Sequence, residues 1–288
     1  MITNIRLQNF RSYQDSSYEF EEGVNVIVGP NASGKTNIIE AILVASRGKS
    51  YRAKDLEVIK HGQPWARIDA DLGSKHRVVK IEKQQDSVKK SFELDDKKLL
   101  RLLGSNRIPV VLFEPNHLLM LGGSPELRRA FLDLLIEQTD HEYGPTINKY
   151  KRALLQRNRL LKNNMPGQLF AWDIRLSELG AQIVAARHLM IKRINEQLTP
   201  TYTQLAKHKS QLTLTYSNPV SAETYGSYLL KKLQKDQPLD LLRGFTAAGP
   251  HREDMVFDLN GQPLANTASR GETRTTLLAL KIIELQIL

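Results

Sequence analysis

The stretch Gly29-Pro-Asn-Ala-Ser-Gly-Lys-Thr36 fits the pattern G-x-x-x-x-G-K-[ST], in which glycines let successive backbone N–H groups point at one anion. The run Val24 to Val28 before it is β-branched, as in a buried strand, and residues 37–45 after it have helical composition. A strand, a loop and a helix in this order predict a phosphate-binding loop for a nucleoside triphosphate. An ordinary glycine-rich turn before a helix is the alternative. The predicted nucleotide contacts are Gly29, Pro30, Asn31, Ala32, Ser33, Gly34, Lys35, Thr36 and Asn37.

Two side chains of this loop have specific predicted roles. Lys35 supplies a positive charge for the β- and γ-phosphates, and the helix that begins beside it adds the positive end of its dipole. The Thr36 hydroxyl is placed to bind the Mg²⁺ that accompanies the nucleotide.

The chain around the loop alternates between strand and helix patterns. Residues 2–10 predict an edge strand, residues 66–94 an antiparallel meander, and residues 108–113 another buried strand. Period-3.6 patterns predict helices at 124–139, 145–163, 170–197, 221–235 and 270–288. Strand signals at 211–216 and 254–259 lie among them, and the second is followed by the turn Asn260-Gly261.

This order predicts an α/β fold that is split by a helical insertion. At 288 residues the chain has room for about two domains. We expect one domain to comprise residues 1–115 and 244–288, and a mostly helical domain to comprise residues 116–243.

The composition limits the classes of function. The chain has no cysteine, which excludes disulfides, thiolate metal sites and a cysteine nucleophile. It has no apolar run of about 18 residues and no leader-like start, so a cytoplasmic protein without membrane contact is expected. The net charge is +10, and residues 105–243 carry 19 Lys and Arg against 12 Asp and Glu. A basic surplus of this kind indicates a polyanionic partner such as nucleic acid.

A basic cluster lies in the predicted helix 145–163. Its six bases, with no acid between the first and the last, are Lys149, Lys151, Arg152, Arg157, Arg159 and Lys162. Several of them share one helix face, which predicts contact with DNA phosphates, with a solvated face as the alternative.

Ser269-Arg-Gly-Glu272 comes where the last predicted helix begins. Ser, Gly and the free N–H groups of a helix start can form a second anion site, which in a head-to-tail dimer closes over the γ-phosphate bound by the other subunit. The alternative is an ordinary capping box, S-x-x-E. The predicted contacts in trans are Ser269, Arg270, Gly271 and Glu272.

Together these segments resemble the RecF family of DNA replication and repair proteins, ABC-type ATPases related to the heads of SMC proteins. The resemblance covers essentially the whole chain and rests on segments that occur in the family's order. They are Leu7 to Tyr13, Gly29 to Asn37, Lys49 to Arg52 with Asp55, Leu56 and Ile59 to Gly62, Phe113 to Leu118, Gly123 to Asp133, Tyr150 to Leu154 with Gln156 to Asn158, Gly249 to Asp254, and Ser269 to Arg274.

The resemblance implies an ABC/SMC-type P-loop ATPase head with a helical lid, with ATP and Mg²⁺ as cofactors. It implies an ATP-dependent homodimer that clamps double-stranded and gapped or junction DNA, cooperates with RecO and RecR to load RecA, and takes part in the SOS response. Arg52 resembles a position where related heads touch DNA, whereas Arg11 is a candidate for the nucleotide phosphates. His251 receives no role.

The chain departs from the family pattern at its end. The resemblance implies a Walker B strand, a D-loop and a switch histidine after the last helix, and none is found before Leu288. The expectation is that the chain is a fragment that hydrolyses ATP poorly, and no catalytic residue is identified. Glu114 is the candidate at the position of the Q-loop.

Other P-loop classes are alternatives. Another SMC-like repair ATPase would carry a sustained coiled coil, which is not visible. A GTPase would need an N-K-x-D segment, which is absent, while a P-loop kinase with no DNA role stays open. A transporter ATPase fits the basic insert less well.

Overall fold

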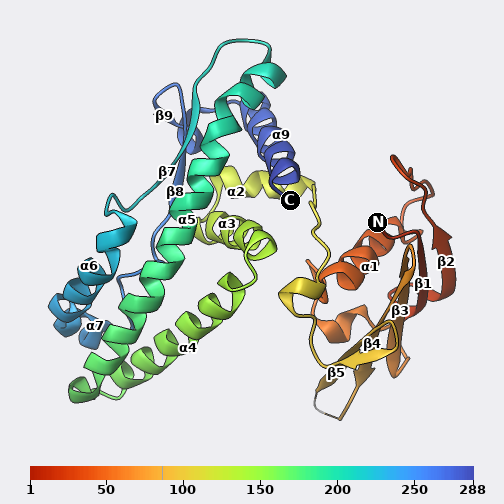
Figure 1. Cartoon of the computed structure of the whole chain (residues 1–288), viewed down its shortest axis with the longest axis horizontal. Coiled ribbons are helices and arrows are strands. Elements are labelled where there is room, and N and C mark those ends of the chain that lie inside the picture. Colours follow the sequence, from red (N-terminus) through yellow and green to blue (C-terminus); the bar gives the residue numbers. More distant parts are fainter. Residues whose placement is uncertain (86) are drawn as a thin grey trace. The chain divides into compact units, whose positions relative to one another are not determined.

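The computed structural model of the chain describes residues 1–85 and 87–288 (Figure 1). It forms two compact units, Met1–Val110 and Val111–Leu288, and each is described by itself. The division into a head (1–115 and 244–288) and a lid (116–243) stays a prediction. Within the described residues, no helix is both long enough and apolar enough to span a bilayer.

The first unit is built on a six-stranded antiparallel sheet in the order β2-β1-β3-β4-β5-β6. The strands are β1 (Asn4–Phe10), β2 (Tyr13–Glu19), β3 (Trp65–Leu72), β4 (Lys75–Lys83), β5 (Val88–Leu94) and β6 (Lys97–Leu99). Helix α1 (Lys35–Arg47) and the short 3-10 turns η1 (Asp55–Val58) and η2 (Gly104–Asn106) complete the unit. The predicted meander is thereby confirmed.

One face of this sheet packs on α1 and the other is polar. Strict alternation sends Ile5 and Leu7 of β1 and Ile68 of β3 inward, where they meet Ala41 and Val44 of α1. This core fixes the orientation of α1, and therefore the place of the phosphate-binding loop that begins the helix.

Three strand predictions were wrong, and one strand was missed. β1 is internal, because β2 pairs with it on one side and β3 on the other. β2 was missed because its sequence, Tyr13 to Glu19, has little apolar character. Val24 to Val28 and residues 108–113 pair with no strand in the described residues, and Val24 is 92 % exposed. A β-branched run is buried only where neighbouring strands flank it, and periodicity says nothing about that.

The second unit is mostly helical. Its helices are α2 (Leu118–Gly122), α3 (Pro125–Thr139), α4 (Tyr143–Lys162), α5 (Leu169–Ala206), α6 (Ala222–Lys235), α7 (Gln237–Arg243), α8 (Leu264–Thr267) and α9 (Arg270–Ile287), with 3-10 turns η3 (Pro115–His117) and η4 (Pro166–Gln168). A small antiparallel sheet, in the order β7-β8-β9, consists of β7 (Leu212–Tyr216), β8 (Met255–Leu259) and β9 (Gln262–Pro263).

The long helix α5 is the central element of this unit, because α4, α6, α9 and β7 all pack against it (Figure 1). The predicted helices are confirmed, but α5 continues to Ala206 instead of ending at 197. Pro200 would normally stop a helix. The helix persists because Leu198 and Tyr202, on either side of the proline, are fully buried in the core.

Candidate functional site

The phosphate-binding loop lies in the first unit, between Val28 and the start of α1. Its second glycine, Gly34, has φ +97°, a conformation that L side chains rarely adopt. A Cβ at Gly34 would also come within 2.7 Å of the Tyr13 hydroxyl and 3.0 Å of the Ser12 hydroxyl. Conformation and space therefore both require glycine here, and the turn between β1 and β2 forms one wall of the loop.

Lys35 folds back over its own loop. Its Nζ donates hydrogen bonds to the carbonyl oxygens of Gly29, at 2.8 Å, and Pro30, at 2.7 Å. An ammonium has three N–H donors, so these two bonds leave one for an incoming anion. The loop is thus shaped around a fixed positive charge.

The first turn of α1 is open to an anion. The N-cap residue Gly34 offers no side-chain acceptor, and the first turn contains no acid. Free amides and the positive end of the helix dipole therefore point out of the loop. Thr36 is exposed in this turn, which suits a hydroxyl that would bind a nucleotide-associated Mg²⁺.

Behind this turn, a fully buried carboxylate holds two arginines. Glu40 of α1 accepts hydrogen bonds from Arg11 Nε and Nη2, at 2.9 and 2.7 Å, and from Arg52 Nη2 at 2.8 Å. Ser50 adds a hydroxyl donor at 2.6 Å. Burial opposes ionisation of Glu40, but these donors outweigh it and lower its pKa from 4.5 to about 2.

The two arginines are the ones that the sequence suggested as ligand contacts, and both are engaged here. Arg11 also donates to the Glu57 carbonyl, and Arg52 donates to Asn37 Oδ1 at 2.7 Å. Asn37 in turn donates to the Ser12 hydroxyl. A chain of polar contacts therefore links Arg52 to the start of α1. Sequence reasoning missed Glu40, although an acid within the apolar run of residues 38–45 was a visible signal.

Glu40 makes the stability of the first unit depend on pH. Because its folded pKa lies below its unfolded pKa, its contribution is present above about pH 4.5 and is lost as the pH falls towards 2. We expect Glu40→Gln to lower the free energy of unfolding by about 3 kcal/mol at pH 6, and by less at pH 3. Urea unfolding followed at both pH values measures this difference.

The matched control is Glu19→Gln, at the exposed end of β2. It should leave the free energy of unfolding nearly unchanged at both pH values. An effect of Glu40→Gln that stayed constant between pH 6 and pH 3 would contradict the role of the ionised carboxylate.

The segment Ser269 to Glu272 begins α9 in the second unit as a complete capping box. Ser269 Oγ accepts from the Glu272 backbone N–H at 3.2 Å, and Glu272 Oε2 accepts from the Ser269 backbone N–H at 2.7 Å. These bonds to Ser269 lower the pKa of Glu272. Ser269, Arg270 and Gly271 all have accessible surface, so the hydroxyl proton of Ser269 can still be donated outward.

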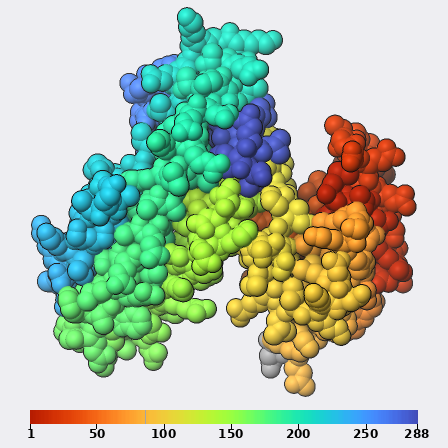
Figure 2. All heavy atoms as spheres, in the orientation of Figure 1, coloured from red at the N-terminus to blue at the C-terminus, as the bar shows by residue number. Residues whose placement is uncertain are grey.

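Five of the six bases of the predicted basic cluster are exposed on α4. Lys149, Lys151, Arg152, Arg159 and Lys162 are exposed on α4, which reaches the surface in light green in Figure 2. We call these five residues the α4 basic stripe. All five side chains are positively charged, so the stripe is suited to contact several phosphates of a nucleic-acid backbone.

Arg157 does not belong to this stripe, and its predicted DNA contact was wrong. It is fully buried, with Nε 2.6 Å from Asp173 Oδ1 and Nη1 2.7 Å from Asp240 Oδ2. Nη1 also donates to the Thr246 hydroxyl at 2.8 Å. Arg157 therefore joins α4 to α5, α7 and the segment before β8. Six bases on a helix cannot all face one side, and this one faces the core.

The Gly-Pro-His-Arg segment, which received no role from sequence, proves to be structural. His251 Nδ1 lies 2.8 Å from the Tyr150 hydroxyl, and burial lowers the His251 pKa to about 4, so the ring is neutral at pH 7. A Cβ at Gly249, which has φ +128°, would collide with the Tyr150 hydroxyl. Further along, Arg128 holds Asp254 with two hydrogen bonds. Periodicity gave no sign of these contacts.

Glu114 stays only a candidate. It lies at the start of η3, where its backbone N–H donates to His117 Nδ1 and its Oε1 is 3.7 Å from His117 Nε2. Nothing in this geometry assigns it to a nucleotide.

Comparison with known proteins gives consistent matches. A family model described as an AAA domain matches residues 4–238. The chain is 32 % identical over 301 residues to the DNA replication and repair protein RecF of Bacillus cytotoxicus, a match that spans 100 % of this chain and 80 % of the relative. It is 34 % identical over 296 residues to RecF of Clostridium acetobutylicum, covering 100 % of this chain and 81 % of that one.

Solved structures agree. A structure of the recombination mediator protein RecF-ATPrS in the RecFOR pathway matches with a TM-score of 0.89 and 28 % identity, over 100 % of this chain and 81 % of the other. An Smc head domain from Pyrococcus furiosus matches with a TM-score of 0.54 and 16 % identity, over 99 % of this chain and 79 % of the other. This second match supports the fold alone.

The fold is therefore α/β, of the ABC/SMC-type P-loop ATPase head, as the sequence predicted. The chain belongs to the RecF family of DNA replication and repair proteins.

Proposed function

We propose that this chain binds ATP at the loop Gly29 to Thr36 and acts as an ATP-dependent DNA clamp in recombinational repair. The observation that carries the proposal is the phosphate-binding loop itself, with Lys35 fixed over it and the first turn of α1 free of caps and acids. Structures of RecF-ATPrS and RecF-ATP, which match 100 % and 99 % of this chain, support the choice of nucleotide.

Different residues would bind the phosphates, the Mg²⁺ and the partner's nucleotide. Lys35 and the first amides of α1 would bind the phosphates, and Thr36 would hold the Mg²⁺, which neutralises the charge of the β- and γ-phosphates. In a head-to-tail dimer, the accessible Ser269 hydroxyl and the α9 N-terminus would close over the γ-phosphate of the partner's nucleotide. ATP would thus hold the dimer together, and its hydrolysis would release DNA.

DNA contact is assigned to the α4 basic stripe. Its exposed cations are suited to phosphates, and contacts to phosphates carry no sequence information. Recognition of gapped or junction DNA, cooperation with RecO and RecR, and loading of RecA belong to the same proposal. The RecFOR pathway named for a RecF relative supports this part.

Sedimentation velocity on the purified chain tests the clamp. With a non-hydrolysable ATP analogue we expect a shift from monomer to dimer, and with a short DNA duplex we expect a further shift that weakens as salt rises. A monomer that responds to neither the analogue nor DNA would point instead to a P-loop enzyme without a DNA role.

Charge reversal on α4 tests the DNA face. The variant Arg152→Glu, Arg159→Glu, Lys162→Glu should weaken duplex binding at least tenfold at low salt. It should also reduce the slope of log K against log salt by about 3, because each phosphate contact contributes about 0.9. Anisotropy of a labelled duplex at several salt concentrations gives both values.

The control reverses Lys231 and Lys235, two lysines on the accessible side of α6. This variant should bind DNA almost as the wild type does. Equal losses in the two variants would mean that DNA responds to net charge and not to the α4 basic stripe.

A further inference from the structure

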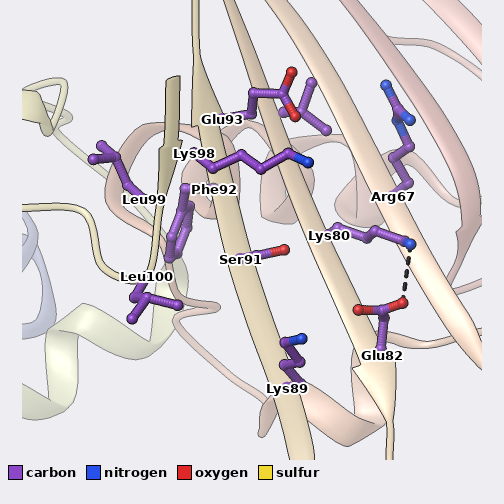
Figure 3. Close-up of a pocket in the computed structure, with 11 residues that line it drawn as sticks. Arg67, Lys80, Glu82, Lys89, Ser91, Phe92, Glu93, Lys98, Leu99 and Leu100 are labelled. Atoms are coloured by element: carbon purple, nitrogen blue, oxygen red, sulfur yellow. Dashed lines mark ion pairs between the residues drawn. The ribbon is translucent and has the colours of Figure 1, made fainter. Parts of the chain in front are cut away.

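The face of the six-stranded sheet that α1 leaves uncovered carries a groove of about 600 Å³ over β3 to β6 (Figure 3). Its volume falls in the range of ligand-binding clefts in proteins. None of the groups assigned above to ATP or DNA lines it, so this groove lies outside the proposed function.

The groove has a surplus of positive charge. Four bases line it, namely Arg67, Lys80, Lys89 and Lys98, against the two acids Glu82 and Glu93. Lys80 is paired with Glu82 at 2.9 Å, and Arg67 is held by Asp69 outside the groove. Lys89 and Lys98 make no hydrogen bond or ion pair with any described residue, and Lys89 interacts with Glu82 only at longer range, so both ammonium groups keep their donors for a ligand.

These two lysines point to the same side of the sheet. Lys98 pairs in register with Glu93 on β5, and Lys89 pairs with Glu82 on β4. In Figure 3 the Lys98 side chain reaches across β5 on the side of Ser91 and Glu93. An extended ligand lying on this face would therefore meet both ammonium groups.

The end of the groove at β6 is apolar and has a free strand edge. Leu99 and Leu100 line it, and Leu100 is 81 % exposed. Within residues 1–85 and 87–288, β6 pairs with β5 alone, so its second edge is free to bind another strand. Main-chain hydrogen bonds to such an edge, with side chains in neighbouring pockets, are a common mode of peptide recognition.

We propose that this groove binds an extended acidic peptide of a partner protein, added to the edge of β6. The peptide's carboxylates would contact Lys98 and Lys89, and one of its apolar side chains would cover Leu100.

A DNA duplex fits this groove less well because its charges are continuous, one per about 1.7 Å along the axis, and some of them would lie next to Glu82 and Glu93. A strand directs alternate residues to one face, so a peptide presents a carboxylate to this face only at every second residue.

The test uses the whole chain and a fluorescein-labelled peptide of nine residues in which Asp and Leu alternate. Anisotropy at 50 mM and 300 mM salt should show binding that weakens as salt rises. Lys89→Glu with Lys98→Glu should weaken binding about tenfold or more at low salt, because two charges that attract the peptide are replaced by two that repel it. Leu100→Ser should weaken binding at both salt concentrations.

Two controls complete the test. Lys231→Glu with Lys235→Glu serves as the charge-matched control and should bind the peptide as the wild type does. The same peptide with Asn in place of Asp should lose most of its affinity. The proposal is overturned if the acidic peptide does not bind, if the groove variant binds it normally, or if that variant loses affinity for duplex DNA and not for the peptide. None of these results depends on ATP, so they leave the proposed function separately testable.

Discussion

Replacing Lys35 by alanine should weaken ATP binding by about 10- to 100-fold. The lysine ammonium lies over the loop, 2.8 Å from the Gly29 carbonyl oxygen and 2.7 Å from that of Pro30, and keeps one N–H donor for a phosphate. Charge-assisted hydrogen bonds contribute about 1.5–3 kcal/mol, and each 1.4 kcal/mol is a factor of ten in affinity. Isothermal titration calorimetry with ATP and Mg²⁺ measures the loss.

Two controls separate this effect from damage to the fold. Lys83→Ala removes an exposed lysine at the end of β4 and should leave ATP affinity unchanged. Thermal unfolding of Lys35→Ala without nucleotide should match the wild type, since the bonds that it removes are to loop carbonyls that water can reach. Undiminished ATP binding by Lys35→Ala would place the nucleotide elsewhere on the chain.

The largest loss of stability is expected for Arg157→Met. This change leaves the carboxylates of Asp173 and Asp240 buried without their shared guanidinium. Removing one partner of a buried ion pair costs about 3–5 kcal/mol, and here a single residue serves two acids. Burial already raises the pKa of Asp173 against the effect of Arg157, so Asp173 should take up a proton in the variant.

Urea unfolding of the variant measures this loss, and Arg159→Met on the exposed side of the same helix is its control. We expect the control to stay within about 0.5 kcal/mol of the wild type, as surface substitutions usually do. If the two variants were equally stable, the buried cluster would contribute nothing, and α4 would be held by its apolar contacts alone.

Much of the fold could be predicted because each correct inference depended on local signals. The helices of the second unit show clear period-3.6 patterns, and the turn at Asn260 and Gly261 has both residues at positive φ, as that dipeptide favours. The wrong predictions are those that depend on which residues pack together in the folded chain. The burial of Val24 to Val28, the internal position of β1 and the persistence of α5 beyond Pro200 all depend on which element packs beside them.

The same difference between local signals and long-range contacts explains which residues of the candidate site could be predicted. Gly34, Lys35 and Ser269 could be identified because their chemistry requires fixed spacing along the chain. Glu40 and Arg157 could not, because their roles come from charges that are far apart in sequence, such as Arg11 with Glu40 and Arg157 with Asp240. A run of bases likewise gives only their number, and burial decides which of them faces solvent.

Helix α5 has one mechanical consequence. Its 38 residues form a rod about 57 Å long, with α4 packed along it at one end and α9 along it as well. A tilt of about 5° at one end of such a rod moves the other end by about 5 Å, more than the length of a hydrogen bond. If α5 rotates as a rigid body, a rotation of a few degrees at one end would therefore displace its other end by several ångströms.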